Sequence, residues 1–162
     1  MLTNHRILIC LLFIVLGLPG CSDSRTDPCQ LLSVHDVKSL DNTVTVSLWA
    51  GRDGERKDDE VCAFYTNDGD PRAMLFVWYD KEKDPVDLAR MAAAELNGRV
   101  AELSNVGSKA AAYFQGDELE FLAAKSTHGV IGLRTRESVK RDSAEQDQLF
   151  LLAEKALSRL QQ

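Results

Sequence analysis

The N-terminal leader constrains this chain most, because it decides which part of the chain folds and in which compartment. Arg6 precedes an apolar run from Ile7 to Leu16. That run is about ten residues long, whereas a helix needs roughly twenty apolar residues to cross a bilayer core. A basic residue followed by a short apolar run is the layout of a secretory signal. We therefore expect residues 1–20 to be a signal peptide that is removed on export.

The leader ends in Leu18-Pro19-Gly20-Cys21. This ending resembles the bacterial lipobox, in which Leu lies three residues before a cysteine and a small residue directly before it. Pro19 replaces the usual Ala, Ser or Thr. The resemblance implies that Cys21 receives a diacylglyceryl group and becomes the new N-terminus, and two or three acyl chains would anchor it stably. The alternative is an unmodified cysteine in a secreted chain.

The residues after the lipobox predict a tether and a location. Residues 22–27 are polar and aperiodic, so that 21–27 is expected to be a short flexible tether between lipid and domain. Residue 22 is Ser rather than Asp, which in a Gram-negative bacterium would direct a lipoprotein to the outer membrane. We therefore expect a lipid-anchored protein of the bacterial cell envelope, attached to the outer membrane and facing the periplasm.

The remaining cysteines form an even pair. Cys10 leaves with the leader and Cys21 takes the lipid, so that Cys29 and Cys62 stay together in an oxidising compartment. We expect a disulfide between them. A reactive thiol or half of a metal site are the alternatives, but neither cysteine lies in a CxxC pair or near a His at ligand spacing.

Composition and charge limit the architecture and the partners. The chain has 162 residues, of which 44% are hydrophobic and 27% charged, and these values are ordinary for one globular domain, here residues 28–162. The net charge of the whole chain is −6. The leader contains one Arg and no acid, so that residues 21–162 carry 18 basic and 25 acidic side chains and a net charge of −7. Because nucleic-acid binding requires clustered Lys and Arg, we expect no nucleic-acid partner.

Three helices have recognisable starts. Ser33 and Asp36 have the spacing of a capping box, which predicts a helix from Val34 to about Leu40. Asp84-Pro85 combines an N-cap with a first-turn proline and predicts a helix over 85–97. The last helix starts at a second capping box and carries an apolar stripe, formed by Leu149, Leu152, Ala153, Ala156, Leu157 and Leu160 after Ser143 and Gln146.

Six segments rich in aromatic and β-branched residues predict strands, namely Val44–Leu48, Val61–Thr66, Ala73–Tyr79, Ala110–Gln115, Leu119–Lys125 and Gly129–Thr135. Three segments are typical of the turns between neighbouring strands, namely Asn67–Pro71, Gly116-Asp117 and Thr127–Gly129. Residues 51–60 are predicted to form a surface loop. The expected order is one helix, three strands, a helix, three strands and a helix. We predict an α+β domain with one antiparallel sheet of about six strands and helices on one face.

Several short motifs together resemble a family of small bacterial envelope lipoproteins with a DPC-x-LL-S/T start and a second cysteine followed by an aromatic residue. The match extends over nearly all of the chain after the leader, although Ser108-Lys109 replaces the Gly-Asp of the family's GxGDxA loop. The segments that match are Asp27–Ser33, Cys62–Tyr65, Val106–Ala111 and the helix segment Leu152–Leu157. The resemblance implies a lipid-anchored domain with one disulfide and no catalytic residues.

Residues that could carry chemistry are sparse. His35 and His128 are the two histidines after the leader, and the chain has no HExxH, GxSxG or P-loop motif. The acids around Asp68–Asp70 and Asp80–Asp84 lack the spacing of a calcium loop, and lysines are interspersed in the second group. We therefore expect no catalytic residue, no metal site and no cofactor.

The aromatic residues on the predicted strands have two interpretations. Packing in the core and on the sheet face is the usual role of such side chains. The alternative is a binding groove on a sheet face that no helix covers, with Trp78 or Tyr113 as its anchor.

Three functional hypotheses remain open. We prefer a non-catalytic, membrane-anchored envelope lipoprotein whose domain binds a protein or a small ligand. The second hypothesis is an envelope hydrolase that uses carboxylates such as Asp117, Glu118 or Glu120, which requires two acids converging in one pocket. The third is a structural or protective lipoprotein of a secretion or toxin system.

The anchor hypothesis predicts the behaviour of a Cys21→Ser variant. Because serine cannot receive the thioether-linked lipid, the chain should remain an unprocessed precursor or appear in the soluble periplasmic fraction. Cell fractionation measures this, and Cys10→Ser is the control that should stay membrane-bound, since Cys10 leaves with the leader. A cleaved Cys21→Ser product that still sediments with the membranes would contradict the anchor.

Overall fold

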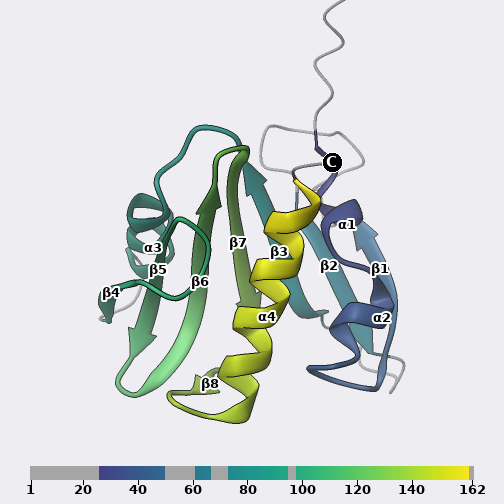
Figure 1. Cartoon of the computed structure of the whole chain (residues 1–162). Helices are drawn as coiled ribbons and strands as arrows, with labels where there is room; N and C mark the ends of the chain where they lie inside the picture. Colours follow the sequence, from purple (N-terminus) through teal and green to yellow (C-terminus); the bar gives the residue numbers. More distant parts are fainter. Residues whose placement is uncertain (1–25, 50–60, 67–72, 95–97, 161–162) are drawn as a thin grey trace, which may run out of the picture.

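The computed structural model describes residues 26–49, 61–66, 73–94 and 98–160 (Figure 1). The predicted signal peptide, Cys21, most of the tether, the 51–60 loop and the 67–71 turn lie outside these residues. The elements follow the chain in the order α1, α2, β1, β2, β3, α3, β4, β5, β6, β7, β8 and α4. The fold is α+β, as predicted, with a higher proportion of sheet.

The sheet has eight strands, and every pair of neighbours is antiparallel. The strands are β1 (Val44–Trp49), β2 (Val61–Thr66), β3 (Ala73–Asp80), β4 (Arg99–Leu103), β5 (Lys109–Gln115), β6 (Glu118–Ser126), β7 (Gly129–Thr135) and β8 (Val139–Lys140). Six of them match the predicted segments closely. The expectation of about six strands, three in each half, is too low because β4 and the two-residue β8 were not predicted.

The strand order is β1-β2-β3-β7-β6-β5-β4, with β8 paired to β6. Strands β1 to β3 form one meander and β4 to β7 form another, and each meander is built from neighbours in sequence. The last strand of each meander lies at the centre of the sheet, where β3 pairs with β7 (Figure 1). A long-range pairing thus joins the two halves of the chain into one sheet.

The helices cover both faces of the sheet, so the prediction that they lie on one face is wrong. Helices α1 (Pro28–Leu31), α2 (Val34–Val37) and α4 (Ala144–Arg159) share a hydrophobic cluster with one face (Figure 1). Helix α3 (Pro85–Ala93) belongs to a second cluster. On β7, Ile131 contributes to the first cluster and the adjacent Val130 to the second, and successive strand residues point to opposite faces.

Continuous burial explains why both faces need a cover. Residues 110–114 of β5 and 121–124 of β6 are buried without interruption, whereas a sheet with one solvated face alternates between buried and exposed positions. Apolar side chains on the second face must therefore be covered as well. Helix α3 provides this cover over β4, β5 and β6, and it also contacts β7.

The predicted helix starts are present with local differences. Ser33 and Asp36 form the complete capping box, with 2.8 Å from Ser33 N to Asp36 Oδ2 and 3.3 Å from Asp36 N to Ser33 Oγ. Ser143 accepts from Gln146 N at 3.3 Å, but Gln146 Oε1 accepts from Asp142 N instead of from the cap residue. The first predicted helix is shorter than expected, because α2 ends at Val37.

Cys29 and Cys62 form a disulfide, which confirms the expected pairing. The bond connects α1 to β2 across a sequence separation of 33 residues. Cys62 is fully buried in the cluster beneath α1 and α4. The disulfide therefore fixes the first helix of the domain on the sheet.

A buried carboxylate connects the N-terminal helices to the C-terminal one. The Asp36 side chain is 3% exposed and forms ion pairs with two residues of α4. Lys155 Nζ lies 2.5 Å from Asp36 Oδ1, and Arg159 Nη1 lies 2.7 Å from Asp36 Oδ2. Burial by itself raises the pKa of Asp36, but hydrogen bonds from Lys155, Ser33 and Arg159 together lower it well below its ordinary value. Asp36 is therefore ionised at neutral pH and holds α2 against α4.

Removing the disulfide should destabilise the domain without changing its fold. In the chain-entropy account, closing a loop of this length stabilises a fold by about 3 to 4 kcal/mol. We expect Cys29→Ala with Cys62→Ala to lower the free energy of unfolding by that amount in urea denaturation. Dithiothreitol should lower the midpoint of the unmodified chain and leave that of the double variant unchanged. An unmodified chain that is insensitive to reduction would contradict this.

Candidate functional site

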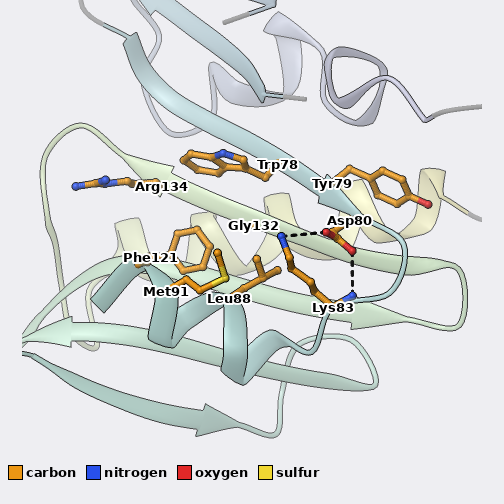
Figure 2. Close-up of a pocket in the computed structure, with 10 residues that line it drawn as sticks. Trp78, Tyr79, Asp80, Lys83, Leu88, Met91, Phe121, Gly132 and Arg134 are labelled. Carbon is orange, nitrogen blue, oxygen red and sulfur yellow. Dashed lines mark hydrogen bonds and ion pairs between the residues drawn. The ribbon is translucent and has the colours of Figure 1, made fainter. Parts of the chain in front are cut away.

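A groove lies between α3 and the centre of the sheet, on the face opposite α4 (Figure 2). Its volume is about 250 Å³. We call it the α3 groove and define it by six residues from four elements: Trp78 on β3, Leu88 and Met91 on α3, Phe121 on β6, and Gly132 and Arg134 on β7. It is the candidate functional site.

The groove exists because α3 covers only part of its face. Val86 and Ala89 of α3 pack with Tyr113 of β5 and with the inner residues of β6. The helix thus lies over β4, β5 and β6 and reaches β7, and β3 lies beyond its edge. Trp78 is consequently half-buried: it contacts the α3 cluster on one side and remains accessible on the other.

A glycine leaves room for the aromatic floor of the groove. Gly132 is paired with Trp78 across β3 and β7. A Cβ at this position would lie 2.7 Å from Cζ of Phe121 and 3.6 Å from Cβ of Trp78. The Phe121 ring therefore lies over the β7 backbone, with its centroid 5.8 Å from that of Trp78 in an edge-on arrangement. Packing of an aromatic ring over a strand glycine compensates for the missing side chain.

The α3 side of the groove is apolar and adaptable. Leu88 is half-buried, and Met91 is 60% exposed. Methionine has a flexible, polarisable side chain that adjusts to differently shaped apolar surfaces. An exposed methionine beside an exposed tryptophan face is therefore suited to contact with a ligand.

One end of the groove is closed by a satisfied ion pair. Asp80 Oδ1 accepts from the backbone N–H groups of Glu82 and Lys83, each at 2.9 Å, and Oδ2 lies 3.3 Å from Lys83 Nζ (Figure 2). Burial raises the pKa of Asp80, but these hydrogen bonds and the Lys83 charge lower it below its ordinary value. The carboxylate is thus ionised and fully engaged.

The other end of the groove carries a cation, Arg134, with no counter-charge among the described residues. Arg134 is exposed and has neither an ion pair nor a hydrogen bond from its side chain to any residue that the structure describes. It is the cross-strand neighbour of Phe76, and Figure 2 shows its side chain beside Trp78 and away from the Asp80–Lys83 pair. The groove therefore has one neutralised end and one cationic end.

The apolar surface continues beyond the groove over the half of the sheet that α3 does not reach. The rings of Phe76 and Trp78 are 5.8 Å apart on β3. Strand alternation places Tyr65 of β2 and its β1 partner Val46 on the same face. We call Val46, Tyr65 and Phe76 the open half-face; no described helix packs on it, and Val46 is 42% exposed.

The predicted candidate residues occupy very different environments. Trp78 lines the groove, whereas Tyr113 lies beneath α3 and is 1% exposed, and its hydroxyl has no hydrogen-bond partner among the described residues. Tyr113 is therefore not accessible to a ligand in the groove. Both histidines are exposed. His35 lies on α2, which packs on β1, and His128 lies in the β6–β7 turn. Strands β2 and β3 therefore separate them.

The carboxylates considered for hydrolysis lie outside the groove. Asp117 and Glu118 are exposed at the β5–β6 turn, where Glu118 accepts from Ser138 Oγ at 2.6 Å, and Glu120 is half-buried on β6. The acid among the groove-lining residues is Asp80, which is already engaged. The groove thus lacks the paired carboxylates that glycoside hydrolysis requires.

Two further properties concern the described residues as a whole. They contain no group of three or more His, Cys, Asp or Glu side chains placed to hold a metal ion. Of the described helices, none has both the length and the apolar character that crossing a bilayer requires.

No protein-family model matches the chain, and no curated protein or solved structure is significantly similar to it. The groove is therefore interpreted from its own geometry. Sequence reasoning identified Trp78 but missed Gly132, Met91 and Arg134. The available signal was a glycine in the interior of a predicted strand, since such a glycine often marks a close approach of another group.

The packing around Gly132 predicts that even a methyl group there is costly. Gly132→Ala should lower stability by about 1 to 3 kcal/mol, because the new Cβ forces the Phe121 ring to move. Thermal denaturation measures the effect. The same substitution in a Phe121→Leu background should cost clearly less, since the two sites are coupled through one contact. Equal costs in both backgrounds would contradict this packing.

Proposed function

We propose that this protein is a non-catalytic envelope lipoprotein, anchored through Cys21, whose domain binds a partner protein at the α3 groove. The α3 groove is the observation that carries the proposal. It combines a half-exposed Trp78, an exposed Met91 and Arg134, which has no ion-pair partner in the described part of the chain, within one concave site.

The composition of the groove is that of a protein-binding site. Aromatic residues, methionine and arginine are enriched in protein interfaces, and the residues that contribute most to affinity gather in pockets near the interface centre. The continuous apolar surface from the groove to the open half-face also favours binding, because such patches on soluble domains mark interaction sites.

The extent of the apolar surface favours a protein over a small ligand. The groove of about 250 Å³ is open, and it continues into the open half-face. One or two side chains of a partner would fill it, while the remainder of the partner covers Val46, Tyr65 and Phe76. A free small ligand would leave that surface in water.

The tether restricts where the partner can be found. Seven residues, 21–27, span at most about 25 Å when fully extended. A domain held by lipid on Cys21 would therefore meet partners at or near the membrane surface. Its net charge of −7 after residue 20 disfavours direct adhesion of the domain to anionic head groups, which keeps its faces available to proteins.

Site-specific photocrosslinking in the native host tests the proposal. Met91 and Leu151 are matched positions, because they are 60% and 61% exposed and lie on α3 and α4, on opposite faces. Met91→p-benzoylphenylalanine should give a discrete crosslinked partner by mass spectrometry, and Leu151→p-benzoylphenylalanine should not. The crosslink should weaken in a Trp78→Leu background. Absence of any crosslink from position 91, or equal crosslinks from both positions, would reject the proposal.

A further inference from the structure

We propose that the α3 groove recognises an extended segment of a partner protein in which an aromatic side chain and an acidic side chain stand two residues apart. The aromatic ring occupies the floor beside Trp78, and the carboxylate pairs with Arg134. This inference rests on the proposed function and specifies the chemistry of the partner.

The charges at the two ends of the groove give it a direction. Lys83 is neutralised by Asp80 at 3.3 Å, and the carboxylate also holds two backbone N–H groups. That end offers a ligand neither a free cation nor a free anion. Arg134 at the other end is free of partners among the described residues, so a ligand's charged group is directed to it.

The guanidinium favours a carboxylate over other polar groups. Arginine presents its N–H donors as a planar fork that matches both oxygens of a carboxylate. The half-buried rings of Phe76 and Trp78 beside Arg134 reduce the access of water, which strengthens a charge pair relative to one in bulk solvent. The net charge of −7 beyond residue 20 repels anions at long range, so that an acidic segment gains affinity only where it reaches Arg134.

The spacing of the motif follows from β7. Gly132 and Arg134 lie two residues apart on this strand, on the same face and therefore roughly 6 to 7 Å from one another. An extended ligand has the same repeat, so that its side chains i and i+2 also point in one direction. Trp78 is the cross-strand partner of Gly132. A ligand ring beside Trp78 and a carboxylate at Arg134 thus fit positions i and i+2 of one extended segment.

The floor of the groove suits an aromatic side chain in particular. Trp78 and Phe121 already meet edge-on with ring centroids 5.8 Å apart, and a third ring can join in an edge-to-face or offset arrangement. A charged or branched polar side chain at this position would lose its hydration without gaining a hydrogen bond.

Fluorine NMR of the full chain in detergent micelles, labelled with 5-fluorotryptophan, tests the inference. Trp49→Phe assigns the resonance of Trp78, since these are the two tryptophans. The probes are acetyl-Gly-Phe-Ser-Glu-Gly-amide and the peptides with Gln or Lys in place of Glu. A charge pair near the surface contributes up to about 1 kcal/mol, or roughly 5-fold in affinity. We expect the Glu peptide to bind about 5-fold more tightly than the Gln peptide, with the Lys peptide weakest.

Charge reversal at Arg134 distinguishes recognition of the acidic side chain from nonspecific binding. Arg134→Glu should invert the order, so that the Lys peptide binds most tightly, and it should leave the melting temperature nearly unchanged because Arg134 is exposed. Lys38→Glu is the matched control: it makes the same charge change at an exposed residue at the end of α2 on the opposite face, and the Glu peptide should remain preferred.

The outcomes distinguish this inference from the proposed function. Equal binding of the three peptides, no binding by any of them, or an unchanged order in Arg134→Glu overturns the aromatic–acidic motif. In each of these cases the crosslink from Met91 still decides independently whether the groove binds a protein. Absence of the crosslink from position 91 rejects the proposed function, and it also rejects the aromatic–acidic motif, which rests on that function.

Discussion

The pairing of β3 with β7 is the interaction on which the rest of this structure depends. It extends over six residue pairs, from Leu75 with Thr135 to Asp80 with Val130. Without it the chain would form two separate meanders, each with an unprotected edge at its last strand. The pairing also places Trp78 beside Gly132, which brings residues from the two halves of the chain together in the α3 groove.

The two faces of this sheet have different roles. On one face the disulfide holds α1 on β2, and Asp36 holds α2 against Lys155 and Arg159 of α4. The disulfide and the Asp36 ion pairs each link distant parts of the chain, so that this face contributes stability. On the other face α3 covers β4, β5 and β6 and reaches β7, whereas β1, β2 and β3 lie beyond its edge. That incomplete cover leaves an apolar surface accessible for binding.

Much of the secondary structure follows from local patterns. The bounds of β2 and β7 coincide with the predicted segments, the Ser33 capping box is complete, and Cys29 is bonded to Cys62. In contrast, β4 was missed because Arg99–Leu103 carries two charged residues at an edge of the sheet. The order of the predicted strands and the cover of both faces were also not foreseen, since adjacent hairpins alone allow several arrangements.

The sequence by itself determined where most of the strands and helices start and which cysteines could pair. These features depend on side chains that are close in sequence or few in number. Only the tertiary structure decided that Tyr113 is buried and Trp78 accessible, although both are aromatic residues on predicted strands. Their difference arises from the position of α3 over β5 instead of β3. Burial at a given position depends on which distant element packs there, and a local pattern does not contain that information.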